Sequence, residues 1–344
     1  MRILIAGLGA IGQRHARNLR TVWGDGLELL AFRRRRLAHV VTDALDADPS
    51  LNVETELALT VFGTLDEALA SGPDAVFVCG PSSQHLEVAQ RAAMAGCHLF
   101  IEKPVSHTLE GVERLRDTVT SRNLIALVGC QWRYHPGIRR LRDLLRAGTL
   151  GRLLRAEIDY GEYLPDWHPY EDYRLSYAAR ADLGGGVVLT QIHDYDLAWW
   201  LFGPFRTVSA TGGRLSDLDI DVEDTVVAQL DGGAVPVVVR QSLASQPPRR
   251  TVSVAGEHGS IHVDLLAARV TMDPPIAPPV EFPDYPRNQM FVDEVRHFQD
   301  CLARKATPAV PLEDGLAVLR LAVAVKESMR ANRSVEILEI EETP

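Results

Sequence analysis

The sequence has few cysteines, and none of them is arranged to hold a metal or a disulfide framework. Cys79, Cys97, Cys130 and Cys301 lie far apart and form no C-x-x-C pair. Zinc modules and disulfide-rich secreted domains both depend on closely spaced cysteines. The sequence therefore predicts reduced thiols, a cytoplasmic protein and no metal site.

Excess positive charge and long apolar runs are also missing. The formal net charge is -10, whereas nucleic-acid-binding domains carry a basic footprint, so nucleic acid is not an expected partner. The apolar runs are too short and interrupted to span a bilayer, which argues against a membrane protein. The expected fold begins at Met1, which leaves no room for a secretory leader.

The chain does contain a strand, a glycine-rich turn and a helix in immediate succession. Met1–Ala6 is a short apolar run of β-forming residues. Gly7–Gly12 (Gly-Leu-Gly-Ala-Ile-Gly) follows, and Gln13–Leu19 is compatible with a helix. A Gly-x-Gly-x-x-Gly turn between a strand and a helix is the fingerprint of dinucleotide binding. We therefore predict that residues 1–128 bind such a cofactor.

Each glycine of this turn has a predicted role. Gly7 permits the tight turn, Gly9 lets the backbone approach a pyrophosphate, and Gly12 lets the helix pack close to the strand. Ala10 and Ile11 begin the helix, whose free N–H groups and partial positive charge attract phosphate. All five residues are predicted to bind the cofactor.

An arginine run follows the second predicted strand, Leu27–Phe32. Such units usually carry an acidic residue about twenty positions past the glycines, which binds a ribose hydroxyl. Arg33 and Arg34 stand there instead, followed by Arg35 and Arg36. The run is either a solvated basic loop or a site for the extra phosphate of NADP, whose geometry suits arginine. Its position favours the second interpretation, so NADP(H) is the predicted cofactor, with NAD(H) still possible.

The rest of the first half alternates strands with helices, which predicts a doubly wound parallel sheet. The expected strands are Asp74–Cys79, His98–Ile101 and Leu124–Gly129, with helices over Gln84–Ala95 and to about Ser121. Ligands bind at the carboxyl ends of strands in such sheets. The cofactor-binding residues predicted at these ends are Cys79, Pro81, His85, Glu102 and Lys103.

Residues 129–344 show a different pattern from the first half: successive strands follow one another with few helices between them. Expected strands are Arg152–Tyr160, Thr207–Gly212, Asp224–Leu230, Ala234–Ser242, Arg250–Ala255 and Ser260–Asp264. Short turns join four of these as hairpins, which predicts a large, open, mostly antiparallel sheet in a second α/β domain. Helices are expected over Arg139–Ala147, Gln289–Arg304 and Leu312–Arg330.

Apolar residues are expected on both faces of this sheet. Val226, Ala228 and Leu230 alternate with Val227, and Val235, Val237 and Val239 add a second apolar row. Exposed apolar patches mark interfaces. One face should pack on the domain's own helices and the other on a second subunit, giving a homodimer or homotetramer.

Four segments together resemble the Gfo/Idh/MocA family of nicotinamide-dependent oxidoreductases. They are Gly7–Leu19, Glu102-Lys103-Pro104, Trp132-Arg133-Tyr134-His135-Pro136 and Gly184–Gly203. The resemblance implies a Rossmann domain, a second domain whose open sheet often mediates oligomer contacts, a sugar or cyclitol substrate, and a catalytic lysine at Lys103.

One position departs from the family pattern. Many members carry an aspartate four residues after the triple glycine, with a histidine further on. Here Thr190 occupies the aspartate position, and His193 follows. Lys103 and His193 therefore carry over as catalytic residues, whereas the aspartate role does not. Asp194 and Asp196 are alternatives for orienting His193.

Hydride transfer from an alcohol requires a group that moves the hydroxyl proton near working pH. Histidine titrates there unperturbed, and lysine does so when burial or positive neighbours lower its pKa. The alternatives are a surface lysine paired to Glu102 and a core histidine. The context of each residue favours catalysis by Lys103 and His193.

Aromatic and polar side chains alternate over Tyr163–Tyr177. Aromatic faces beside hydrogen-bonding groups suit sugar rings, although a packed loop or an oligomer contact is an equal alternative. Asp166 and His168 lack a third ligand at fixed spacing, so they predict no metal. The predicted substrate-binding residues are Arg133, Tyr163, Trp167, His168, Tyr173, Gln191 and Asp194.

The sequence as a whole predicts an NADP(H)-dependent oxidoreductase that acts on a secondary alcohol or ketone of a sugar, nucleotide sugar or cyclitol. An enzyme that uses a bound cofactor transiently, in epimerisation or glycoside cleavage, is one alternative. A cofactor-sensing protein without turnover is another.

Overall fold

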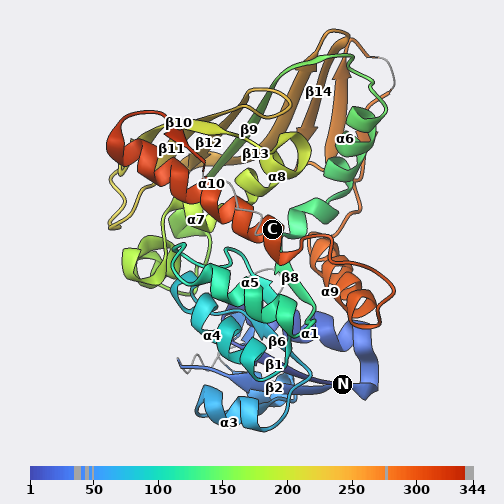
Figure 1. Cartoon of the computed structure of the whole chain (residues 1–344), viewed down its shortest axis with the longest axis vertical. Coiled ribbons are helices and arrows are strands. Elements are labelled where there is room, and N and C mark those ends of the chain that lie inside the picture. Colours follow the sequence, from blue (N-terminus) through green and yellow to red (C-terminus); the bar gives the residue numbers. More distant parts are fainter. Residues whose placement is uncertain (35–39, 43–45, 49, 276–277, 338–344) are drawn as a thin grey trace.

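The described residues form two large β-sheets and a small two-stranded one, with helices between and around the large sheets (Figure 1). The computed structural model describes residues 1–34, 40–42, 46–48, 50–275 and 278–337. Figure 1 shows the parallel sheet and its helices at the bottom and the larger sheet at the top.

The first sheet has six strands in the order β5-β2-β1-β6-β7-β8, and every neighbouring pair is parallel. Side chains alternate along β1 between two cores: Ile3 and Ile5 join one cluster, and Leu4 and Ala6 join the other. The predicted doubly wound sheet is therefore confirmed. The strands are β1 (Arg2–Ala6), β2 (Glu28–Phe32), β5 (Thr60–Phe62), β6 (Ala75–Val78), β7 (His98–Glu102) and β8 (Ala126–Gly129), beside a small pair, β3 (Val40–Val41) and β4 (Ala47–Asp48).

Helices cover both faces of this sheet. One face packs on α1, joined by the later helix α9, because Val295 and Phe298 share the core of Ile3 and Ile5. The other face packs on α4 and α5. The helices are α1 (Ala10–Trp23), α2 (Val53–Glu56), α3 (Leu65–Ala70), α4 (Ser82–Met94), α5 (Val112–Ser121) and α9 (Gln289–Leu302).

The second sheet has nine strands in the order β16-β15-β14-β13-β9-β12-β11-β10-β17. It is mostly antiparallel, as predicted, except that β9 and β12 run parallel. The predicted strand from Arg152 to Tyr160 continues to Tyr163. The strands are β9 (Leu153–Tyr163), β10 (Thr207–Gly213), β11 (Thr225–Asp231), β12 (Val237–Ser242), β13 (Ala244–Gly256), β14 (Gly259–Asp264), β15 (Arg269–Asp273), β16 (Val280–Glu281) and β17 (Val335–Glu336).

The two faces of this sheet differ in polarity, although Val227 leaves an apolar residue on the outer face, as expected. Val226, Ala228 and Leu230 are fully buried, and their partners Val237 and Val239 lie on the same face. On the other face of β9, β12 and β13, ion pairs link Glu157 to Arg240 and Asp159 to Arg249, while Val227 of β11 is 41% exposed. The apolar rows of β11 and β12 lie on one face because the register pairs Leu230 with Val237 and Ala228 with Val239.

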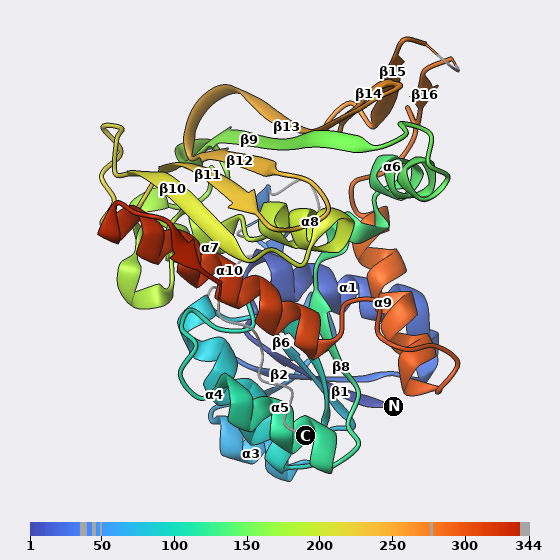
Figure 2. The same cartoon turned by 45° about the horizontal axis from the view of Figure 1, so that its top comes forward.

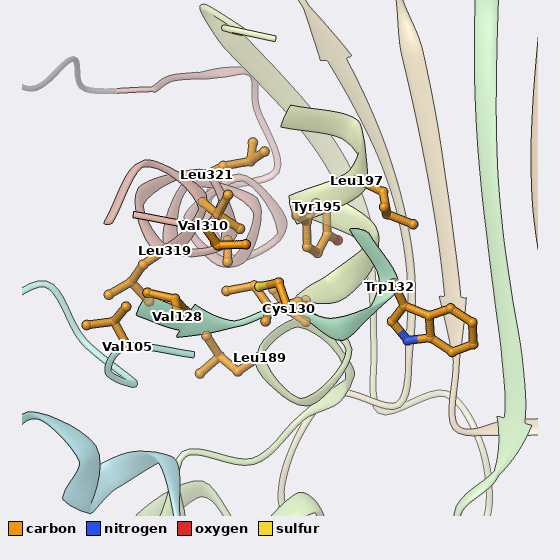
Figure 3. Packing of buried hydrophobic residues seen from close by; sticks show 14 of the residues in the cluster. Val105, Val128, Cys130, Trp132, Leu189, Tyr195, Leu197, Val310, Leu319 and Leu321 are labelled. Atoms are coloured by element: carbon orange, nitrogen blue, oxygen red, sulfur yellow. The ribbon is translucent and has the colours of Figure 1, made fainter. Parts of the chain in front are cut away.

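Three helices connect the sheets. Figure 2 shows α7 (Val187–Thr190), α8 (His193–Phe202) and α10 (Leu312–Ala331) between the large sheet and the parallel one, with α6 (Pro136–Arg146) at the far end. Figure 3 shows the core there: β8 and Cys130 meet α7, α8 and α10 through Val128, Leu189, Tyr195, Leu319 and Leu321, whereas Trp132 of the η2 turn (Gln131–Tyr134) points towards the strands of the large sheet. The candidate site residues in α8 and in the turn before it therefore lie on helices that are packed in this core. Within the described ranges, none of the helices is long and apolar enough for a bilayer.

Candidate active site

The glycine turn after β1 has the geometry that a dinucleotide needs. Gly7 adopts a φ of 111°, which favours glycine, and its N–H donates to the Phe32 carbonyl at 2.8 Å. A Cβ on Gly12 would lie 1.9 Å from the Gly7 carbonyl oxygen, so the helix approaches the turn as closely as only glycine allows. A Cβ on Gly9 would meet no atom within 4 Å. Open space over Gly9 fits a pyrophosphate at the backbone.

The N-terminus of α1 adds the electrostatic part of this site. Gly9 caps the helix without a side-chain hydrogen bond, and no acidic residue lies in the first turn. Ala10 and Ile11 are the first two helical residues, and the N–H groups of a first turn have no intrahelical acceptor. These donors and the helix dipole suit a phosphate.

The arginines after β2 are paired with acidic side chains. Arg33 forms an ion pair with Glu54 of α2, and Arg34 lies 3.5 Å from a carboxylate oxygen of Glu87 on α4. Arg35 and Arg36 lie outside the described residues. A 2′-phosphate bound here would have to exchange with these carboxylates.

The predicted cofactor-binding residues after β6, Cys79 and His85, make hydrogen bonds that connect the ends of neighbouring strands. The Cys79 N–H donates to the Ala6 carbonyl at 2.8 Å, and burial raises the pKa of its thiol well above the ordinary value. Pro81 is the N-cap of α4. The ring nitrogens of His85 each lie 2.7 Å from a carbonyl oxygen, those of Gly80 and Pro104, so this side chain ties the turn after β6 to the turn after β7.

Glu102 and Lys103 at the end of β7 point to different partners. A carboxylate oxygen of Glu102 lies 2.6 Å from Nε2 of His15 on α1, in a buried pair. The Lys103 ammonium donates to the backbone carbonyl of Thr190 at 2.6 Å. Lys103 is therefore directed at the segment that carries His193. The Thr190 hydroxyl donates to the Gly186 carbonyl at 2.7 Å and so faces its own helix.

His193 is the first residue of α8 and is only 4% exposed. Burial lowers its pKa well below the ordinary value, and the positive charges of Lys103, Arg250 and Arg287 lower it further. Its Nδ1 is buried without a hydrogen-bond partner in the described part of the chain. An imidazole in this environment is neutral near pH 7 and can accept a proton.

Two predicted substrate residues, Gln191 and Asp194, flank His193 in a buried polar network. The Gln241 amide donates to the Gln191 carbonyl at 2.7 Å and to Asp194 at 2.8 Å. Arg250 donates to the side-chain oxygen of Gln191 and lies 3.8 Å from Asp194. Burial raises the pKa of Asp194, an effect that the positive charge of Arg250 opposes.

Neither aspartate considered as an orienting partner hydrogen-bonds the His193 ring. Asp194 is engaged by Gln241, and Asp196 forms a buried ion pair with Arg133 at 2.6 Å. Arg133 also pairs with Asp314 at 2.8 Å. Two ion pairs thus already occupy the guanidinium of Arg133, and its contact with a substrate stays a prediction.

Arg250 and Gln241 were not among the predicted site residues, although the sequence carried a signal for both. Arg250 lies on the same face of its strand as Val252 and Val254, and Gln241 continues the row of Val237 and Val239. A polar residue in a buried row needs a polar partner inside the protein. That partner is the network beside His193.

The aromatic segment after β9 makes mostly internal contacts. The His168 ring lies 3.2 Å from Glu171 and stacks on Tyr170, and the Tyr173 hydroxyl accepts from the Asp219 N–H at 3.2 Å. No described hydrogen bond or ion pair connects Tyr163, Trp167, His168 or Tyr173 to Lys103 or His193. Their contact with a substrate stays a prediction. In the part of the chain that the structure describes, no cluster of three or more His, Cys, Asp or Glu could hold a metal.

The parallel sheet, its glycine turn and the Lys103–His193 region define a nicotinamide-dependent oxidoreductase. Comparison with known proteins agrees. Residues 1–130 match the oxidoreductase family with an NAD-binding Rossmann fold, and residues 138–262 match the GFO/IDH/MocA C-terminal domain. The chain belongs to the Gfo/Idh/MocA family, as the sequence motifs indicated.

Individual relatives span the whole chain. The myo-inositol 2-dehydrogenase of Thermotoga maritima is 27% identical over 99% of both chains. The scyllo-inositol 2-dehydrogenase (NAD(+)) of Bacillus subtilis is 26% identical over 98% of this chain and 96% of the relative. Among solved structures, levoglucosan dehydrogenase in complex with NADH superposes with a TM-score of 0.83 at 18% identity, covering 99% of this chain and all of the other.

Proposed function

We propose that this protein transfers hydride between a nicotinamide cofactor and a secondary alcohol or ketone of a sugar, nucleotide sugar or cyclitol, in the cytoplasm. The observation that carries the proposal is the buried His193, close to Lys103, which follows a strand of the sheet that holds the glycine turn and donates to the Thr190 carbonyl. The inositol dehydrogenases among the relatives support this substrate class. Residues 1–128 would bind the cofactor and residues 129–344 the substrate.

The chain's own residues would handle the proton. The glycine turn would hold the pyrophosphate of a nicotinamide cofactor, and the nicotinamide would supply the carbon that exchanges hydride with the substrate. His193 accepts the hydroxyl proton as the alcohol is oxidised and returns it in the reverse direction, because its imidazole is held neutral. Lys103 donates a hydrogen bond to the substrate oxygen, which stabilises negative charge there.

Replacing Lys103 with alanine tests this assignment. Lys103→Ala should lower turnover ~100- to 1,000-fold, the usual effect of removing one donor to a developing negative charge. NADH binding should persist, because the glycine turn contributes most of it. Lys305→Ala, at an exposed position, is the matched control. The measurement is reduced-nicotinamide fluorescence with a panel of sugars and cyclitols. Near-normal turnover of Lys103→Ala would remove this residue from the mechanism.

We further propose that NADP(H) is preferred over NAD(H) through Arg33 and Arg34. Glu54 competes with a 2′-phosphate for Arg33, so Glu54→Gln should tighten NADPH binding and leave NADH binding level. Arg33→Asp should weaken NADPH binding by on the order of ten- to a thousandfold, since charge-assisted hydrogen bonds contribute ~1.5–3 kcal/mol each. Paired NADPH and NADH titrations measure both effects. Equal wild-type affinity for the two cofactors would contradict the preference.

We also propose a homodimer or homotetramer. Two features of the outward face of the large sheet support this proposal. They are the ion pairs Glu157–Arg240 and Asp159–Arg249 and the exposed Val227.

A further inference from the structure

One arginine of the large sheet is buried against the candidate active site. Arg250 of β13 is 4% exposed, and its guanidinium lies 4.7 Å from the centre of the Trp132 ring and 4.4 Å from that of Tyr160. Arginine stacks on aromatic faces and keeps its charge when buried. The two rings, from η2 and β9, therefore fix the direction of the guanidinium.

The other contacts of Arg250 lie on both sides of His193. It donates to the side chain of Gln191, two residues before His193, and faces the carboxylate of Asp194, the next residue. Asp194 is fully buried, and the Arg250 guanidinium lies within ion-pair distance of it. Removing one partner from a buried charge pair leaves the other uncompensated. The turn between α7 and α8 is thus anchored to the sheet through this side chain together with Gln241, which donates to the same two residues.

We propose that Arg250 is a positioning residue for His193: it fixes the turn from Gln191 to Asp194 against the large sheet and compensates the Asp194 carboxylate, so that a neutral imidazole faces the substrate. The inference rests on the proposed catalytic role of His193. The charged groups that act on this ring are Lys103 after β7, Arg250 on β13 and Arg287 before α9, and Asp194 is the next residue of α8. Of these, Arg250 alone contacts both flanks of the histidine.

Four variants test the role of Arg250 in the full-length protein. Arg250→Met should lower kcat roughly ten- to a hundredfold and move the acidic limb of the pH–rate profile upward by about one pH unit, because the positive charge of Arg250 disfavours protonated His193 and its removal also leaves Asp194 uncompensated. KM for NADH should not change.

Arg250→Lys should recover the position of the limb but only part of kcat, since lysine restores the positive charge without the planar, forked guanidinium. Arg250→Met/Asp194→Asn, which removes both charges, should return the limb to its wild-type pH. The neighbouring Arg249→Met, on the exposed face, should behave as wild type.

The outcomes separate this inference from the proposed function. His193→Ala with normal turnover and an unchanged limb would overturn the role of His193, and this inference with it. A His193→Ala variant that loses turnover, combined with a wild-type limb and kcat in Arg250→Met, would overturn the positioning role alone. A lower kcat in Arg250→Met without movement of the limb would also overturn it, because that result indicates packing. If Arg250→Met does not fold, the limb of Arg250→Lys and of the charge-free double variant decides in the same way.

Discussion

At the residue scale, burial disfavours the charged form of several histidines of this chain. Burial lowers the pKa of His85 and His193, and it lowers that of His135 to about 4. His135 is 2% exposed and caps α6, because its Nδ1 accepts from the Gly137 N–H at 3.1 Å. A histidine with a lowered folded-state pKa contributes stability that is present above the unfolded pKa near 6.5 and is lost as pH falls below it.

His135 should therefore make the fold sensitive to mild acid. The wild type should lose about 2 kcal/mol of unfolding free energy through this residue between about pH 7.5 and about pH 5. His135→Asn keeps a capping acceptor but does not titrate, so its loss over the same range should be smaller by that amount. Urea denaturation of both proteins at both pH values measures the difference. Equal losses would show that His135 is not the titrating group.

The chemistry of the site was partly visible at this scale. Lys103 and His193 follow recognisable motifs, so their positions could be predicted from residue order alone. Arg250 and Gln241 could have been suspected, because each places a polar group in a buried row. Their actual partners, Gln191 and Asp194, depend on how the large sheet packs on α8, which no local pattern of residues specifies.

At the element scale, the three glycines of the β1–α1 turn serve different purposes. Gly12 allows α1 to touch the turn, whereas Gly9 leaves open space outside it. The first is a requirement of the fold and the second a requirement of the ligand, which substitution can separate.

Gly9→Ala and Gly12→Ala should therefore fail in different ways. Gly12→Ala places a Cβ 1.9 Å from the Gly7 carbonyl oxygen, so the strand and helix must separate and the melting temperature should fall. Gly9→Ala meets no atom and has an ordinary backbone conformation, with φ at -70°, so its melting temperature without cofactor should match wild type. Its NADH affinity should nevertheless fall, because the methyl group occupies the space for the pyrophosphate. Calorimetry with and without NADH distinguishes the two. A Gly9→Ala protein with normal affinity would place the pyrophosphate elsewhere.

At the same scale, sequence patterns locate the strands but do not predict how the strands pair. Alternation of apolar residues located the strands of both sheets, because each strand buries one face or two. The parallel pairing of β9 with β12 could not be predicted, since these strands are more than seventy residues apart and nothing in either one selects its neighbour. The polar outer face was also missed, because the register that places both valine rows inside is set by pairing between strands.

At the scale of the whole molecule, the two sheets are held together by helices that belong to the second half of the chain. α9 packs on α1 beside the parallel sheet, and α10 contacts both β8 and β10. One face of the large sheet is therefore covered within the chain. The opposite face is where a second subunit would have to bind.

The polar character of that face leads to a specific expectation for assembly. Arg240 lies on it, paired with Glu157 at 2.9 Å, so an interface there would include charges of both signs from each subunit. Arg240→Glu places like charges together and should lower the mass measured by light scattering at micromolar concentration from that of a dimer or tetramer towards that of a monomer. Arg122→Glu, at an exposed position beyond α5, changes net charge equally and should leave the mass unaltered.

Raising the salt concentration should weaken the wild-type assembly, because exposed charges are screened over about 10 Å at 0.1 M ionic strength. A monodisperse wild-type monomer would rule out the assembly, and an Arg240→Glu protein of unchanged mass would move the interface to another surface.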